Sequence, residues 1–252
     1  MPVVLMIAWT VLAMPAIGPA YGAPAETAPC REVAFEQSAF TVCTFDLTRT
    51  QLRLHWKDPN GEAYGNLGKL VEAENQKMPP LLFAMNAGMY RADNSPVGLY
   101  IENGQQLVKA NTASGPGNFH LKPNGVFYID GDTAGVVETG KFLKLHPTAE
   151  FATQSGPMLV IEGKLHPRFQ ANGPSLKIRN GVGIRDPHTV VFAISNEAVS
   201  FGDFARLFRD EFGCQNALFL DGSISSLYAP SVDRNDQLWP AGPIVSARAR
   251  GK

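Results

Sequence analysis

The sequence has no charged residue in its first 25 positions and no long apolar run after them. The apolar run over residues 3–17 is followed by two small-residue patterns that a signal peptidase accepts, at 20–22 and 23–25. We therefore predict a signal peptide over residues 1–25 and one domain over residues 26–252. The alternative is a membrane anchor, but the run is shorter than the roughly 20 residues that span a bilayer, and two prolines interrupt it. The expected location is the periplasm or the outside of the cell, with no stable membrane insertion after cleavage.

The chain also lacks an excess of charge of either sign, and it has few cysteines. Its net charge is −1, which argues against a nucleic-acid partner. No Cys/His spacing matches a zinc site, and we predict no metal and no other cofactor. In an exported protein we expect Cys30 and Cys43 to form a disulfide worth about 3 kcal/mol on the entropy model. Cys214 follows a glycine and precedes an apolar strand, so we expect a buried thiol there.

Glycine and proline are frequent, at 24 and 19 residues, which is typical of short strands and turns rather than long helices. We predict a single α+β domain of mixed, mostly antiparallel β-sheet with two principal helices. The first helix is expected near 67–77 and the second over 200–213, where Ser200 and Asp203 form a capping box. Segments 40–46 and 51–56 alternate in polarity, and we expect them to pair with each other as antiparallel strands.

Turn signals predict the rest of the sheet. Asn103-Gly104 and Asp130-Gly131 each separate two strand-like segments, which indicates β-hairpins. Buried strands are expected at 81–85, 158–161, 189–194 and 217–220, with a final strand near 243–247. No composition shift or internal repeat divides the chain.

Three of the predicted strands end in polar, glycine-containing loops, at 86–90, 154–157 and 221–226, and the segment 179–183 has the reverse order. If these ends converge, they bring together a guanidinium, a carboxylate, amides and hydroxyls. That set suits a sugar joined to a phosphate. Asp221 is the central residue because it stands at the end of a buried strand on a glycine turn. Taken alone, the motif favours the alternative, a carboxylate that caps its own turn.

The chain resembles the phosphodiester glycosidase family from about residue 80 to residue 230. Four blocks carry the resemblance in the family's order: Asn-Ala-Gly at 86–88, Gly-Pro-Met-Leu at 156–159, Arg-Asn-Gly-Val-Gly at 179–183, and Leu-Asp-Gly-Ser-Ile-Ser-Ser at 220–226. One departure stands out, because Ser223 and Ile224 occupy positions where the family has glycines. The branched Cβ of Ile224 would obstruct a close approach of backbone amides to a phosphate.

The resemblance implies hydrolysis of a sugar C1–O–phosphate bond, with a sugar phosphodiester or a related envelope saccharide as the substrate. Arg179 is the candidate phosphate ligand and Asp221 the candidate nucleophile or base, with Glu197 as a second candidate carboxylate. Eight residues are candidates to hold sugar hydroxyls or phosphate oxygens: Asn86, Gly88, Gln154, Ser155, Asn180, Gly222, Ser223 and Ser225. A divalent cation at Asp221 stays open, since a carboxylate and hydroxyls suit a hard cation.

Two other functions stay open at this point. The first is a non-catalytic saccharide-binding or envelope-organising protein that keeps the family's cleft, which the Ile224 substitution favours. The second is a serine hydrolase that uses Ser155 or Ser223, although Ser155 lacks the preceding glycine pattern of a nucleophile elbow. An isolated Arg179 is also readable as a surface ion-pair residue.

Overall fold

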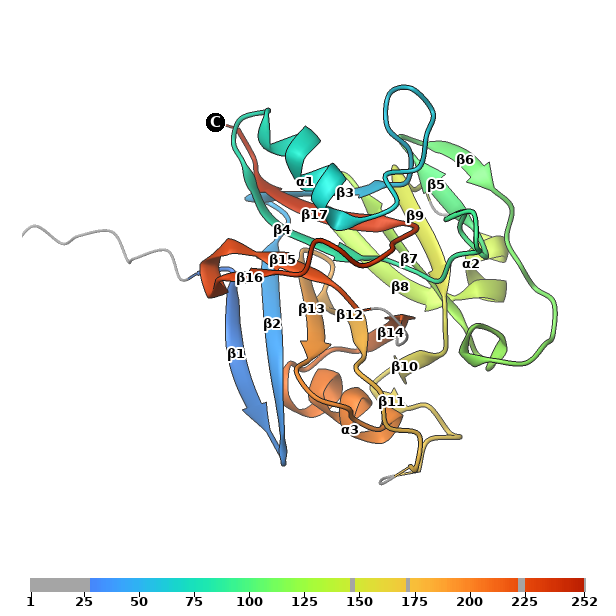
Figure 1. Cartoon of the computed structure of the whole chain (residues 1–252). Helices are drawn as coiled ribbons and strands as arrows, with labels where there is room; N and C mark the ends of the chain where they lie inside the picture. Colours follow the sequence, from blue (N-terminus) through green and yellow to red (C-terminus); the bar gives the residue numbers. More distant parts are fainter. Residues whose placement is uncertain (1–27, 146–147, 171–172, 222–224, 252) are drawn as a thin grey trace, which may run out of the picture.

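The computed structural model describes residues 28–145, 148–170, 173–221 and 225–251 (Figure 1). The predicted signal peptide, Gly222, Ser223 and Ile224 lie outside these residues. The described chain folds into three antiparallel sheets that enclose a shared core. The largest sheet has seven strands in the order β1 (Cys30–Phe35), β2 (Ser38–Asp46), β13 (Thr189–Ser195), β12 (Asn180–Asp186), β14 (Asn216–Asp221), β10 (Met158–Ile161) and β11 (Lys164–Leu165).

The other two sheets have five strands each. The second sheet has the order β16 (Arg234–Asn235), β15 (Leu227–Ala229), β4 (Leu81–Asn86), β17 (Ile244–Ala249) and β3 (Thr50–His55). The third sheet has the order β6 (Gln105–Val108), β5 (Tyr100–Glu102), β9 (Phe151–Ser155), β7 (Gly125–Asp130) and β8 (Thr133–Glu138). Both predicted hairpins are confirmed, as β5–β6 and β7–β8.

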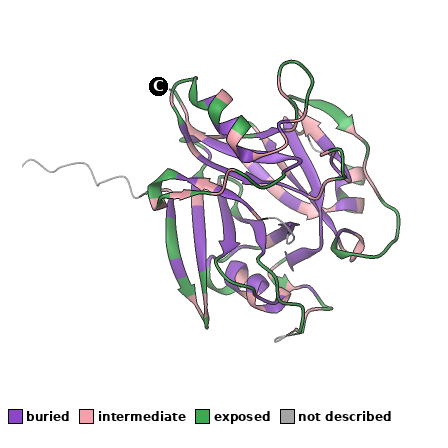
Figure 2. Cartoon of the chain, viewed as in Figure 1, coloured by how far each residue is buried: buried purple, intermediate pink, exposed green. Residues whose placement is uncertain are grey.

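The shared core lies where the inner faces of the three sheets meet, and the buried strands surround it (Figure 2). Aromatic rings from different sheets pack against each other there. The Phe83 ring of β4 lies 4.9 Å from the Phe192 ring of β13, and Phe127 of β7 lies 5.9 Å from the same Phe192 ring. Aromatic pairs at these separations add attraction beyond the area they bury. Every second residue of a strand points to the inner face of its sheet. Contacts among these inward side chains join the three sheets into one domain.

Each sheet has one short α-helix on its outer face. Helix α1 (Leu67–Asn75) covers the second sheet, α2 (Thr139–Leu145) covers the third, and α3 (Phe201–Arg206) covers the seven-stranded sheet and continues as a π-helical turn over Leu207–Glu211. The predicted capping box is confirmed, because Ser200 Oγ accepts from the Asp203 N–H and Asp203 Oδ2 accepts from the Ser200 N–H. Two 3-10 turns, Asn118–His120 and Pro230–Val232, complete the described helical elements.

Two predictions about the fold need correction. The described residues form three short α-helices, whereas two principal helices were predicted. The prediction omitted α2, because its seven residues make too few turns to show a periodic pattern. The predicted pairing of segments 40–46 and 51–56 is also wrong. Strand β2 pairs with β1 and β13, whereas β3 pairs with β17 in the second sheet. Both segments do form strands, but the turn at Asp46–Thr50 carries the chain from the seven-stranded sheet to the second sheet.

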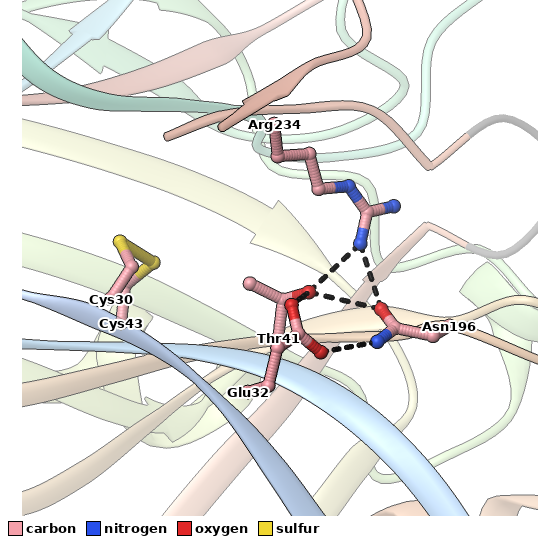
Figure 3. Close-up of a disulfide and its surroundings, with 6 residues drawn as sticks. All are labelled: Cys30, Glu32, Thr41, Cys43, Asn196 and Arg234. Carbon is pink, nitrogen blue, oxygen red and sulfur yellow. Dashed lines mark hydrogen bonds between the residues drawn. A yellow bond between two sulfur atoms is a disulfide. The ribbon is translucent and has the colours of Figure 1, made fainter. Parts of the chain in front are cut away.

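The predicted disulfide between Cys30 and Cys43 is confirmed, and it joins directly opposed positions of β1 and β2. Cys214 is a buried free thiol, as predicted. A polar cluster lies beside the disulfide and links the first two sheets (Figure 3). In it, Arg234 Nη1 donates to Thr41 Oγ1 at 3.0 Å and to Asn196 Oδ1 at 2.8 Å. This cluster ties the β15–β16 hairpin, which follows the Asp221 loop, to the seven-stranded sheet.

Candidate active site

The candidate site lies where the seven-stranded sheet meets the second sheet. Asp221 is the last residue of β14, and Asn180, directly opposite it, is the first residue of β12. Asn86 is the last residue of β4, on the neighbouring sheet. All three are buried, and Asp221 keeps 6% of its surface exposed. Each of the three residues stands at one end of its strand, and these strand ends lie at the border between the two sheets.

The three residues form one hydrogen-bonded network. Asn86 Nδ2 donates to Asp221 Oδ2 at 3.3 Å. Asn180 Nδ2 donates to Asn86 Oδ1 at 2.7 Å and to the Asn86 carbonyl at 3.0 Å, and Asn180 Oδ1 accepts from the Asp221 N–H at 2.7 Å. The structure therefore brings Asn86, Asn180 and Asp221 together in one place.

Backbone partners decide which end of each amide is oxygen. The Asp221 N–H can only donate, so the atom of Asn180 that it meets is the oxygen. The Ser226 N–H donates to Asn86 at 3.0 Å, which identifies Oδ1 of that residue in the same way. Asn86 consequently presents its NH₂ group to the Asp221 carboxylate. Asn86 Oδ1 accepts from Asn180 and from the Ser226 N–H, and these two bonds fix the position of its amide. The amide NH₂ group in turn orients the Asp221 carboxylate.

Three serines lie near the end of β14, the strand that carries Asp221. Ser155 Oγ is buried and donates to the Leu220 carbonyl at 2.9 Å, so it supports the end of β14. Ser225 Oγ donates to the Asp221 carbonyl at 3.3 Å. Ser226 is fully buried, and among the described residues its hydroxyl has no hydrogen-bond partner. Ser226 was not among the predicted site residues, although it is the last residue of the 220–226 block.

Tyr90 is a second residue that sequence analysis missed. Burial raises the pKa of its phenol above the usual value of 10, and the negative charge of Asp221 raises the pKa further. Its hydroxyl therefore stays a hydrogen-bond donor at neutral pH, and it donates to the Pro240 carbonyl at 2.9 Å. The residue belongs to the polar loop after β4 that also contains Asn86. That shared loop was the signal that could have identified it.

Arg179 precedes Asn180, the first residue of β12, and its side chain is fully buried. Its guanidinium carbon lies 3.6 Å from the centre of the Phe201 ring, and Nε and Nη2 donate to the Val199 and Ser175 carbonyls. Burial lowers the pKa of Arg179 to about 10, so the group stays charged at neutral pH. Its third nitrogen, Nη1, is buried and has no partner among the described residues. Among the described residues, Arg179 makes no hydrogen bond or ion pair with Asp221.

Other predicted residues lie further from the network. Gln154 Oε1 accepts from the Leu99 and Asn111 N–H groups, and Nε2 donates to the Asn111 carbonyl, so its amide holds a neighbouring loop. Gly88 lies close to β9, where an added Cβ would stand 3.0 Å from Thr153 Oγ1.

The structure does not bring Glu197 to Asp221. Glu197 is exposed beyond the end of β13, and its carboxylate accepts from the Ala39 N–H of β2 at 2.9 Å. Strand β12 separates β14 from β13, which is a distance of about 10 Å across the sheet.

Two further findings concern only the described residues. Within 28–145, 148–170, 173–221 and 225–251, no three His, Cys, Asp or Glu residues lie together in an arrangement that could bind a metal ion. In those ranges, no helix has both the length and the apolar character needed to cross a membrane.

Fold and site together define a mostly antiparallel β protein with a carboxylate–amide network at the border of two sheets. Residues 80–246 match the family model for phosphodiester glycosidases. The uncharacterized protein YigE of Escherichia coli (strain K12) is 41% identical over 201 residues, which cover 80% of this chain and 78% of YigE. The chain belongs to the phosphodiester glycosidase family, as its four sequence blocks predicted.

Solved structures show the same fold at low sequence identity. The zebrafish N-acetylglucosamine-1-phosphodiester alpha-N-acetylglucosaminidase catalytic domain, auto-inhibited by its pro-peptide, aligns with a TM-score of 0.59 at 13% identity, over 88% of this chain and 82% of that domain. A hypothetical protein from Synechocystis aligns with a TM-score of 0.56 at 14% identity, over 88% of this chain and 61% of its own.

Proposed function

We propose that this protein is an exported hydrolase that cleaves the C1–O–phosphate bond of a sugar phosphodiester. Family membership supports the reaction class. Three buried side-chain donors have no partner within the described residues: Trp56 Nε1, Arg179 Nη1 and Ser226 Oγ. The proposal is carried by the last two, because Arg179 and Ser226 adjoin the segments that form the Asp221 network. Leaving such a group unpaired costs about 1–3 kcal/mol. A ligand oxygen in the site would supply the missing acceptors.

The two donors belong to chain segments that also contribute to the carboxylate network. Arg179 is adjacent in sequence to Asn180, and the Ser226 N–H is bonded to Asn86. A guanidinium that is held by two carbonyls and one aromatic face is pre-organised for a phosphate oxygen, because little side-chain freedom is lost on binding. We assign the phosphate to Arg179 and leave the sugar hydroxyls to the amides and serines beside Asp221.

In this proposal Asp221 acts at the anomeric carbon, either as the nucleophile or as the base for an attacking water. Water adds to C1, the C1–O bond breaks, and the products are a free sugar and a phosphate monoester. The phosphate monoester is a good leaving group, so a strong general acid is less important than in ordinary glycosides. Glu197 stays outside the mechanism, because its carboxylate is exposed beyond β13 and accepts from the Ala39 N–H on the far side of that strand.

Two observations bear on the alternatives. Ser155 donates its hydroxyl to a backbone carbonyl, and among the residues that the structure describes no histidine is bonded to it, which argues against its use as a nucleophile. The Cys30–Cys43 disulfide supports export, because such bonds persist in oxidising compartments.

The test is release of free sugar from UDP-N-acetylglucosamine and from nitrophenyl-phosphoryl sugars. We expect Asp221→Asn to lower kcat by about a thousandfold or more while substrate binding is retained, since positioned carboxylates contribute on that scale. Asp233→Asn is the matched control, because Asp233 is exposed and lies in the left-handed region that Asn tolerates. A wild-type protein that binds these compounds without releasing sugar would establish the non-catalytic saccharide-binding function instead.

A further inference from the structure

The loop over residues 236–243 runs from the β15–β16 hairpin to β17 and is firmly anchored. The Ala241 N–H donates to the Gly65 carbonyl at 2.9 Å, and the Ala87 N–H donates to the Pro243 carbonyl at 2.8 Å. Tyr90 Oη donates to the Pro240 carbonyl. Two of these three bonds join the loop to residues that follow Asn86, so the loop forms an edge of the candidate active site.

This anchored loop holds two large apolar side chains in solvent. Leu238 is 92% exposed and Trp239 is 60% exposed. Among the described residues they are the only exposed large hydrophobics that are adjacent in sequence. Isolated exposed apolar residues are ordinary, but a rigid loop that presents a tryptophan beside a site is typical of a binding surface.

Leu238 also borders a groove of about 480 Å³ between the loop and α1. Its polar lining comes from Asn66, Lys69, Glu72, Asn75 and Gln237. Two of these side chains are held in place: Asn66 Oδ1 caps α1 by accepting from the Lys69 N–H, and Asn75 Oδ1 accepts from the Leu81 N–H. The groove therefore offers ordered amides along its floor and an apolar lip at one side.

The chemistry of this surface indicates its ligand. Amides donate and accept hydrogen bonds in the way that sugar hydroxyls require, and an indole ring packs against the apolar face of a sugar ring. Lys69 and Glu72 balance each other, so the groove has no cationic excess. An anionic membrane surface or a nucleic acid would require clustered Lys and Arg residues.

We propose that the groove between α1 and Gln237–Leu238 binds a saccharide chain, with the exposed Trp239, next in sequence to Leu238, as the stacking platform beside the groove. The ligand is a neutral oligosaccharide, and the groove lengthens the sugar side of the substrate beyond the bond that is cleaved. This extension rests on the proposed hydrolysis, whereas saccharide binding itself does not. The groove and the Asp221 network share only the loop that connects them, so their functions can be tested separately.

The binding test uses Asp221→Asn protein, which we expect to bind substrates without turnover, and tetrasaccharides of N-acetylglucosamine, glucose and mannose. We expect at least one of them to bind by calorimetry and to change the tryptophan fluorescence. The other tryptophan of the described chain, Trp56, packs against Tyr100, so the change reports on Trp239. Adding Trp239→Ala should weaken binding about tenfold or more. Trp239→Phe should keep the affinity within about threefold and remove the fluorescence change.

Leu107→Ala is the control, because Leu107 is an exposed apolar residue on β6, in another sheet. It should leave binding unchanged. The inference is overturned if none of the three tetrasaccharides binds, if Trp239→Ala binds as well as the parent, or if Trp239 is needed only for binding to phosphatidylglycerol vesicles. In the active protein, Trp239→Ala should raise KM for an oligosaccharyl phosphodiester while KM for the monosaccharyl compound is unchanged. Trp239-dependent binding without any hydrolysis would refute only the proposed reaction, and hydrolysis without Trp239 dependence would refute only the groove.

Discussion

Replacing Asn180 by Ala tests whether the amide network supports both the fold and the site. The change removes one acceptor, which receives the Asp221 N–H at 2.7 Å, and two donated bonds to Asn86, at 3.0 and 2.7 Å. The Asp221 N–H and the Asn86 carbonyl are main-chain groups in a buried region, and each loses its hydrogen bond to the Asn180 side chain. At about 1–3 kcal/mol for each group, we expect the free energy of unfolding to fall by about 2–6 kcal/mol.

The assay is urea unfolding of wild-type, Asn180→Ala and Asn180→Asp proteins, followed by the sugar-release assay on each folded variant. Asn180→Asp keeps the acceptor for the Asp221 N–H but turns an oxygen toward two oxygens of Asn86. It should therefore destabilise the protein at neutral pH, and less so in acid, where a protonated carboxyl group can donate one bond. Asn235→Ala is the control, because Asn235 is exposed and has no described side-chain bond. A loss below about 0.5 kcal/mol for Asn180→Ala, the range of neutral surface changes, would refute the reasoning.

Two further predictions concern residues outside the network. Arg234→Ala removes bonds to Thr41, Asn196 and Asp236, whose carboxylate also accepts from the Leu227 N–H, so we expect sugar release to slow and stability to fall by about 1–2 kcal/mol, with Arg234→Lys intermediate. Unchanged unfolding and kinetics would contradict this. Burial lowers the pKa of His55 to about 4, so the unfolded chain takes up a proton first as the pH falls. Stability should be full above pH 6.5 and decline by about 3 kcal/mol towards pH 4, and a His55→Gln protein with the same pH profile would show that another group is responsible.

Much of the fold was predictable because its signals are local. The Asn103-Gly104 and Asp130-Gly131 turns specify hairpins through the backbone conformations they favour, and Ser200 with Asp203 specifies a helix start through two bonds three residues apart. The disulfide was predicted because Cys30 and Cys43 are close in the sequence of a chain expected to be exported, and the two residues occupy opposed positions of β1 and β2. Helix α2 was missed because one buried phenylalanine in seven residues gives no clear period.

The candidate site was predictable only in part. Polar loops after apolar strands correctly indicated that Asn86, Asn180 and Asp221 lie together. The orientation of Arg179 towards Phe201 was not predictable, because it depends on which face of a strand a helix covers. Likewise, Gln154 has a loop-supporting role that follows from partners on distant strands.

The sequence by itself determined the short strands, their hairpin turns, the main helix cap and the residue types that the site contains. Only the tertiary structure decided which strands share a sheet and how the polar side chains meet. Asn86 and Asp221 are 135 residues apart in the chain, and Asn86 and Asn180 are 94 apart. Strand and turn preferences act between near neighbours, whereas these contacts form only when three sheets close on one core and bring their strand ends to a common border.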